Sequence, residues 1–231
     1  MNRRPFTGFP LEGIQFLHDL AQNNNKIWFE AHKQTYLDAL QNPAIALVET
    51  LGERLKQHFP EIGYDTRSNG SGTLMRMYRD TRFSADKSPY KTNVAMMFTP
   101  GTGKKMEVPG FGLQVTPEQV DVVAGIFAFP KSMLTFYRES VLDDKQGKAL
   151  EEAIQAVHQA GNYTIGGETY KRIPSGYDAS HPRAEWLKFT GLSVSPAAIG
   201  LDLAQTPALV DALMTHFVNM APIQQWLTSI L

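Results

Sequence analysis

The stretch that decides the fold is VAMMFTPGTGKKMEVPGFGLQVTPEQVDVVAGIF, residues 94–127. Its apolar runs are rich in β-branched and aromatic residues, which favour β-strands. These runs are interrupted first at Gly101-Thr102-Gly103 and then at Thr116-Pro117-Glu118, and both interruptions are short. Short breaks favour antiparallel strands joined by hairpins over parallel strands joined by helical crossovers. The predicted strands cover residues 94–98, 111–115 and 120–127.

A fourth strand is predicted just upstream, at residues 73–79. Leu74, Arg76 and Tyr78 alternate there with Met75, Met77 and Arg79, and period-two alternation is typical of a strand. The central sheet is therefore expected to contain about four strands.

Helical spacing marks both ends of the chain. Apolar residues recur every three or four positions before Pro60 and again after residue 133, as they do on the buried face of a helix. The run Asn23-Asn24-Asn25 is predicted to end one helix and cap the next, Asn42 is predicted to cap another helix, and Trp28 is interpreted as a packing residue. Residues 163–200 are irregular and rich in Gly, Pro and Ser. The sequence predicts an α+β protein with a central antiparallel sheet, flanked by N- and C-terminal helices, in a single domain spanning residues 1–231.

Composition limits the function classes. The 231 residues carry a net charge of −1 and a pI near 6.6, so any electrostatic function needs local clustering. The chain has no cysteine, which excludes disulfides, thiolate catalysis and sulfur-ligated metals. No histidine pair has metal-ligand spacing, so a histidine-based metal site is not expected. An oxygen-ligated magnesium site stays open, and the cofactor is unknown. The N-terminus lacks the apolar core of a signal peptide, and no run is long enough to span a bilayer. A soluble, cytoplasmic protein without a membrane partner is expected.

Charge clusters between residues 67 and 91. This segment holds six basic and two acidic residues, a net charge of +4, which leaves −5 for the rest of the chain. Arginine forks and lysine ammonium groups suit phosphate or carboxylate oxygens. We therefore expect an anion site in which Tyr90 adds a hydrogen bond and Asp86 is a candidate for proton transfer. Its predicted cationic residues are Arg76, Arg79, Arg82, Lys87 and Lys91, with Arg172 as a candidate to join them in space.

The same charges allow a purely structural interpretation. Pairs such as Arg79–Asp80 and Asp86–Lys87 would tie down a long surface loop, although exposed ion pairs contribute only about 0–1 kcal/mol each. His181, in GYDASHPRAEW, has two interpretations as well. It is a candidate general base oriented by Asp178, or a turn histidine bonded to the backbone.

Several segments resemble one known family. They are NNNKIWFEAHKQTY (residues 23–36), RDTRFSADKSPYKTN (79–93), VPGFGLQVTP (108–117) and KRIPSGYDASHPRAEWL (171–187). These runs are similar to the domain-of-unknown-function family numbered 2461, and the resemblance covers nearly the whole chain. It implies one conserved domain in a cytosolic, bacterial-type protein, and it implies no reaction.

Three functions follow from the residues. The first is binding, with or without enzymatic turnover, of a small phosphate- or carboxylate-bearing molecule at the basic segment. The second is nucleic-acid binding, because Tyr78, Phe83 and Tyr90 interleave with the cations as stacking platforms do. The pI opposes this second function, since nucleic-acid binders usually have a wider basic footprint. The third is a ligand-free protein-interaction module. The sequence does not decide between enzyme and binding protein, and it leaves the oligomeric state open.

Overall fold

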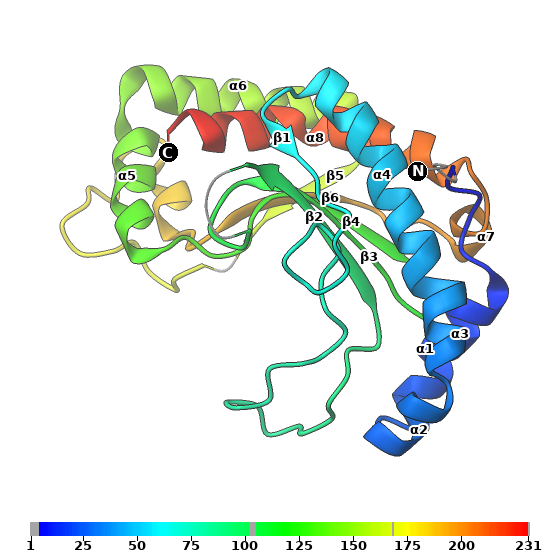
Figure 1. Ribbon diagram of the computed structural model, residues 1–231. Coiled ribbons are helices and arrows are strands. Elements are labelled where there is room, and N and C mark those ends of the chain that lie inside the picture. Colours follow the sequence, from blue (N-terminus) through cyan, green and yellow to red (C-terminus); the bar gives the residue numbers. More distant parts are fainter. Residues whose placement is uncertain (1–4, 102–104, 168, 231) are drawn as a thin grey trace. The chain divides into compact units, whose positions relative to one another are not determined.

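The computed structural model describes residues 5–101, 105–167 and 169–230. Within these residues the strands form an antiparallel sheet of six, in the order β1-β2-β3-β4-β6-β5 (Figure 1). The α+β class is confirmed, and the sheet has six strands rather than about four. The strands are β1 (Ile62–Gly63), β2 (Val94–Pro100), β3 (Gly110–Val115), β4 (Val120–Ile126), β5 (Tyr163–Gly166) and β6 (Leu192–Pro196).

The three central predictions are confirmed as β2, β3 and β4. The strands that the sequence missed are short or lie in the segment interpreted as irregular. β1 has two residues, too few for any pattern. β6 does alternate, because the buried Leu192 and Val194 are each followed by a serine, but its Gly- and Pro-rich surroundings hide this signal. β5 pairs with β6 only, antiparallel, from Tyr163↔Pro196 to Gly166↔Ser193.

The strand predicted at residues 73–79 is wrong as a regular strand. The segment forms two isolated antiparallel bridges, Leu74↔Met96 and Tyr78↔Tyr90. Leu74 and Tyr78 lie four positions apart in the sequence, whereas their partners Met96 and Tyr90 lie six positions apart. The pairing register therefore shifts by two residues between the bridges. Backbone bonds follow each register, with Met75 N donating to Ala95 O at 2.9 Å and Lys91 N donating to Met77 O at 2.7 Å. This offset breaks the ladder, as a bulge does.

The chain divides into two compact units. The first comprises residues 1–101, 112–122 and 198–214, and the second residues 102–111, 123–197 and 215–231. Each unit is described by itself, and the expected single domain stays a prediction. The helices of the first unit are α1 (Leu11–Gln22), α2 (Lys26–Ala31), α3 (Lys33–Tyr36), the π-helix η1 (Leu37–Gln41), α4 (Asn42–His58) and α7 (Leu201–Ala204).

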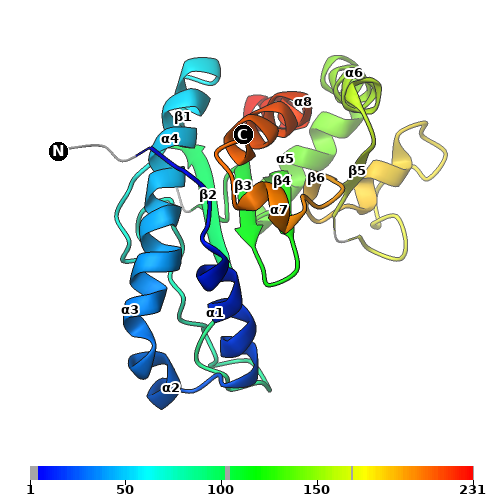
Figure 2. The same ribbon diagram turned by 90° about the vertical axis from the view of Figure 1, so that its right-hand side faces the viewer.

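In the first unit, α1 packs beside α3 and η1 (Figure 2). The cap predicted within Asn23-Asn24-Asn25 is confirmed, and Asn25 is the capping residue, since its side chain accepts from Trp28 N at 3.0 Å. The predicted cap at Asn42 is wrong, because the helix continues from α3 through η1 into α4. Asn42 N donates to Leu37 O five residues back. This wider π turn lets the helix pass Pro43, which has no N–H to donate.

The second unit contains α5 (Lys131–Leu142), α6 (Asp144–Ala160), the 3₁₀ helix η2 (Ala184–Lys188) and most of α8 (Leu209–Ser229). Helix α8 is continuous through Pro222. A proline inside a helix costs about 3 kcal/mol. Its neighbours Ala221 and Ile223 are buried, and their packing favours the continuous helix. Among the helices of the described ranges, none is long and apolar enough to cross a bilayer.

Gly125 fixes the contact between β4 and β6. Its φ is +117°, and a Cβ placed there would lie 2.3 Å from Leu192 O. In β5, a Cβ on Gly166 would meet nothing within 4 Å. A comparison of alanine substitutions at these two glycines therefore separates the backbone requirement at Gly125 from the general effect of adding a methyl group.

We predict that Gly125→Ala lowers the free energy of unfolding by roughly 2–6 kcal/mol, the sum of backbone strain and an overpacked contact. Gly166→Ala is the matched control and changes it by less than about 1 kcal/mol. Urea denaturation of the two variants measures the difference. Equal stabilities would contradict the assigned β4–β6 approach.

Candidate functional site

The basic loop, residues 76–91, belongs to the first unit and is closed by Arg79. In Figure 1 it is the teal loop that projects from the strands. Arg79 donates to the Asp86 carboxylate and, at 3.4 Å, to Ser88 O. Asp86 also accepts from the amide and hydroxyl of Ser88, at 2.9 and 2.6 Å. Arg79 and Asp86 thus bind each other and join the two sides of the loop.

Two more cations of the basic loop have partners within it. Arg82 donates from Nε and Nη2 to the two oxygens of Asp80, at 3.0 and 2.7 Å. Lys87 Nζ donates to Thr81 O at 2.9 Å. Ion pairs do tie the loop, but their partners differ from the expected Arg79–Asp80 and Asp86–Lys87. Each arginine pairs with a carboxylate that is not its immediate neighbour, Arg79 with Asp86 seven residues later and Arg82 with Asp80 two residues earlier.

These contacts set the acidity of the two aspartates. Hydrogen bonds from Ser88, followed by the one from Arg79, lower the pKa of Asp86 far below its ordinary value. The guanidinium of Arg82 lowers the pKa of Asp80 to about 2. A general base works best with a pKa near the operating pH. The geometry therefore gives Asp86 a role in fastening the loop and makes it a weak base.

Tyr90 anchors the end of the basic loop. It is 1% exposed, and its ring stacks on Phe29 with centroids 4.0 Å apart. The Asn24 carboxamide binds both backbone groups of Tyr90, donating to O at 2.9 Å and accepting from N at 3.0 Å. Burial, together with a hydrogen bond to the Tyr78 hydroxyl, raises the pKa of Tyr90 to about 12. Tyr90 is thus a buried support whose hydroxyl contacts Tyr78.

Arg76 and Lys91 differ from the other cations of the loop. Within the described residues, neither forms an ion pair with a carboxylate. Arg76 is exposed and Lys91 is half-buried. Burial lowers the pKa of Lys91, and the nearby positive charge of Arg76 lowers it further. Arg76 and Lys91 thus lie near each other at the base of the loop and neither is in an ion pair, although the charge of Arg76 also helps to lower the pKa of Asp80.

The remaining predicted site residues belong to the second unit. Arg172 lines a shallow hollow of about 510 Å³ with Tyr170, Lys171 and Pro174. The structure thus places Arg172 in a different unit from the cations of the basic loop.

His181 has a backbone partner. Its Nδ1 accepts from Arg183 N at 3.1 Å, which matches the turn-histidine interpretation. Asp178 accepts from the amide and hydroxyl of Ser180, at 2.8 and 2.7 Å. Each member of the predicted dyad is thus engaged with its own turn.

The sequence profile of one family, described as "Conserved hypothetical protein (DUF2461)", matches residues 12–226. The chain belongs to this family. A comparison with curated proteins finds no match. The DUF2461 match includes the whole basic loop and also residues 171–187, so the resemblance drawn from those segments is confirmed.

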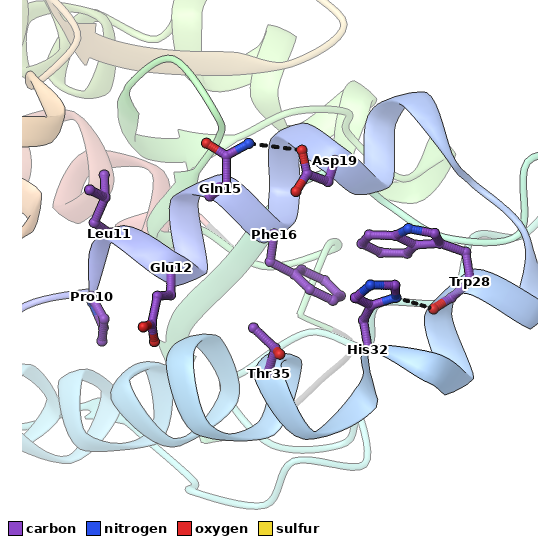
Figure 3. Close-up of a pocket in the computed structure, with 9 residues that line it drawn as sticks. All are labelled: Pro10, Leu11, Glu12, Gln15, Phe16, Asp19, Trp28, His32 and Thr35. Atoms are coloured by element: carbon purple, nitrogen blue, oxygen red, sulfur yellow. Dashed lines mark hydrogen bonds between the residues drawn. The ribbon is translucent and has the colours of Figure 1, made fainter.

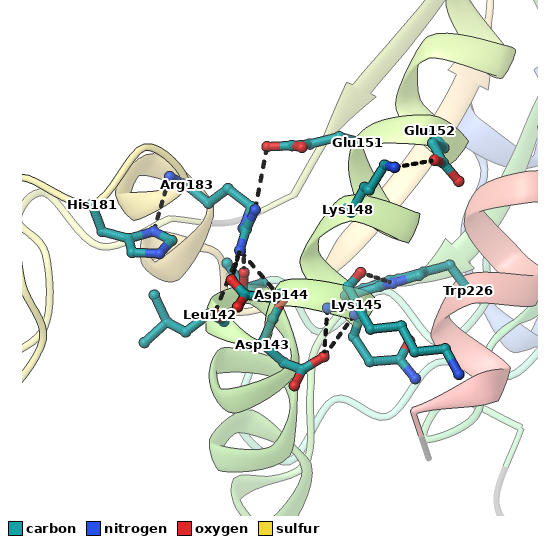
Figure 4. Close-up of polar contacts among 12 residues, drawn as sticks. Leu142, Asp143, Asp144, Lys145, Lys148, Glu151, Glu152, His181, Arg183 and Trp226 are labelled. Atoms are coloured by element: carbon teal, nitrogen blue, oxygen red, sulfur yellow. Dashed lines mark hydrogen bonds and ion pairs between the residues drawn. The ribbon is translucent and has the colours of Figure 1, made fainter.

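Arg183, beside His181 in the DUF2461 match, has a structural role (Figure 4). Its side chain is 13% exposed. Nε donates to Val141 O at 2.7 Å, and Nη2 lies 3.4 and 3.3 Å from the carbonyls of Leu142 and Asp143. Carbonyls in the last turn of a helix have no intrahelical donor. Arg183 thus satisfies the end of α5, and Glu151 of α6 lies 3.7 Å from its Nη1.

We predict that Arg183→Met lowers the free energy of unfolding by about 2–4 kcal/mol, since it leaves the part-buried carbonyls of Val141 and Leu142 without this donor. Arg172→Met, at an exposed arginine, is the control and changes it by less than about 0.5 kcal/mol. Chemical denaturation measures both. If Arg183→Met were as stable as the control, the capping role would be wrong.

A groove that the sequence did not predict lies between α1 and the α2–α3 segment (Figure 3). We call it the α1–α2 groove, and its volume is about 660 Å³. Trp28, interpreted from sequence as a packing residue, does pack on Phe16 at 5.2 Å between ring centroids, and it also lines the groove. The groove is lined by Pro10, Leu11, Glu12, Gln15, Phe16, Asp19, Trp28, His32 and Thr35.

The sequence spacing of the residues that line this groove already indicates that they lie on common helix faces. Glu12 and Asp19 lie seven residues apart, which places them about two helical turns apart along α1. Trp28 and His32 lie four apart, one turn, and neighbouring side chains at that spacing meet. Helical periodicity alone assigns such residues to packing, because it does not show which face of α1 meets which face of α2.

No metal centre emerges from the geometry. Over residues 5–101, 105–167 and 169–230, no three His, Asp or Glu side chains gather closely enough to hold a metal ion.

Proposed function

We propose that the protein binds the phosphate or carboxylate group of a small molecule between Arg76 and Lys91. The observation that carries the proposal is this pair of neighbouring cations without a paired carboxylate. An anion between them would remove their mutual repulsion and add charge-assisted hydrogen bonds. The proposal keeps the cytoplasmic location expected from the sequence.

The other cations of the basic loop serve the site indirectly. Arg79 and Arg82 are occupied by Asp86 and Asp80, and Lys87 by a carbonyl. These contacts stiffen the loop, so that the position of Lys91 relative to Arg76 is largely fixed before a ligand arrives. Preorganisation of this kind improves binding because less ordering is needed on association.

Tyr78 adds a neutral donor next to the cations. Its side chain is exposed, and its ring lies 5.1 Å from that of Tyr90. The hydrogen bond between the two hydroxyls orients the Tyr78 oxygen. We assign binding rather than proton transfer to this site, because Asp86 is held as a strongly acidic carboxylate.

Phe83 is the one observation that favours nucleic acid as a second candidate. Its ring is 95% exposed, with the Arg82 guanidinium 5.7 Å from its centroid, a combination on which unpaired bases stack. The net charge of −5 outside the basic segment opposes a long phosphate track, so the small anion remains the preferred ligand.

We predict that inorganic phosphate binds the wild-type protein at low ionic strength, and that Arg76→Gln and Lys91→Met each weaken binding about tenfold or more. This factor corresponds to the loss of one hydrogen bond from a charged group, about 1.5–3 kcal/mol. Lys87→Met is the control and loses clearly less affinity, because Lys87 contacts only a loop carbonyl and not the ligand. Isothermal titration calorimetry, repeated at raised salt, provides the measurement.

Two results would overturn the proposal. One is no detectable phosphate or acetate binding by the wild type. The other is an equal loss in the Lys87→Met control, which would indicate a diffuse surface charge. Phe83→Ala separates the second candidate, because single-stranded oligonucleotide binding would depend on this ring and phosphate binding would not.

The lowered pKa of Lys91 predicts that the protonated form of this residue destabilises the folded state. The folded state disfavours the ammonium form, so the unfolded chain binds more protons between the lowered pKa and the ordinary value of about 10.4. Below the lowered pKa, the charge on Lys91 therefore reduces the free energy of unfolding. This loss is recovered as the pH rises from the lowered pKa to the ordinary value. Lys91→Met removes a charge that the folded state disfavours and keeps the aliphatic stem.

We predict that Lys91→Met is at least as stable as the wild type at neutral pH, and that its advantage shrinks above about pH 10. Urea denaturation at the two pH values tests this. A variant clearly less stable than the wild type at neutral pH would show that Lys91 supports the fold.

A further inference from the structure

We propose that the α1–α2 groove is a second binding site, specific for a small organic cation with an apolar body and a protonated amine. This site is independent of the anion site at Arg76 and Lys91. It rests on the shape of the groove, its aromatic surface and the sign of its charges.

The shape suits a small molecule. At about 660 Å³, the α1–α2 groove falls within the range of about 300–1,000 Å³ that is usual for ligand pockets. The Phe16 ring, 3% exposed, is held by Trp28 on one side and by Phe29, 5.9 Å away between centroids. The apolar part of the groove is therefore preformed by packing within the first unit.

Trp28 and His32 form its aromatic end. Their rings are stacked, with centroids 4.1 Å apart and planes at 18°, and Trp28 is half-buried while His32 is exposed. His32 Nδ1 lies 2.8 Å from Trp28 O. A carbonyl only accepts, so Nδ1 carries a proton, and in the neutral ring Nε2 is left as an acceptor. Aromatic surface with an acceptor suits an ammonium group and its carbon substituents.

The charge of the groove has one sign. Glu12 and Asp19 line it, and its nine lining residues include no lysine or arginine. Gln15 Nε2 donates to Asp19 Oδ1 at 2.8 Å (Figure 3), which holds that carboxylate in place. A cation with an apolar body complements both the negative charge and the aromatic floor, whereas an anion of the same size would be repelled.

The test uses three probes that share a phenyl ring: 2-phenylethylammonium, the neutral 2-phenylethanol and the anionic 3-phenylpropionate. ¹H–¹⁵N spectra of the full chain report the indole N–H of Trp28, assigned through Trp28→Phe, and calorimetry gives affinities. We expect the ammonium probe to shift the Trp28 signal and to bind more tightly than both analogues. Glu12→Gln and Asp19→Asn should each weaken it roughly threefold to tenfold.

Glu118→Gln removes an exposed carboxylate outside the groove and should leave the affinity unchanged, as should Arg76→Gln at the anion site. Circular dichroism confirms that each variant is folded. The proposal is overturned if the ammonium probe does not bind at millimolar concentration, or if it binds no better than 3-phenylpropionate. It is also overturned if Glu12→Gln and Asp19→Asn behave like Glu118→Gln.

Discussion

The contact on which the candidate anion site depends is the pair of hydrogen bonds between the Asn24 carboxamide and the backbone of Tyr90. Asn24 follows α1, and Tyr90 lies 66 residues later in the chain. A side-chain amide carries both donor and acceptor groups, so it can bind the backbone N–H and C=O of one residue as a neighbouring strand does. With Phe29 stacked on the ring of Tyr90, this contact fixes the end of a loop that has no regular secondary structure of its own.

Once Tyr90 is fixed, the rest of the basic loop is determined by short-range chemistry. Asp86 is held by Ser88, two residues later, and receives Arg79 across the loop. Arg82 folds back on Asp80. The loop therefore uses most of its charges to define its own shape, and the two that remain, Arg76 and Lys91, are the ones with chemistry to offer a ligand. Counting basic residues would have weighted all of them equally.

Sequence patterns predicted the helices and strands whose positions are determined by local periodicity. The stripe of Leu47, Leu51 and Leu55 is fully buried, and the central strands form where β-branched and aromatic residues cluster. Periodicity failed where tertiary contacts decide. Pro222 looks like a helix end until the burial of its neighbours outweighs it, and the π turn before Pro43 depends on a bond that no pattern signals. At the candidate site, charge clustering identified the segment that holds Arg76 and Lys91, whereas the choice of ion-pair partners required the three-dimensional course of the loop.

The two-residue shift between the Leu74↔Met96 and Tyr78↔Tyr90 bridges has a consequence for how this protein meets copies of itself. The two extra residues lie between Tyr90 and Met96, so residues 73–79 and 90–96 do not form one straight ladder to which a strand approaching from outside could add along its whole length. Arg76 and Arg79 would add unfavourable desolvation to such an approach. Irregular, charged borders of this kind discourage one sheet from extending into the next and so oppose aggregation.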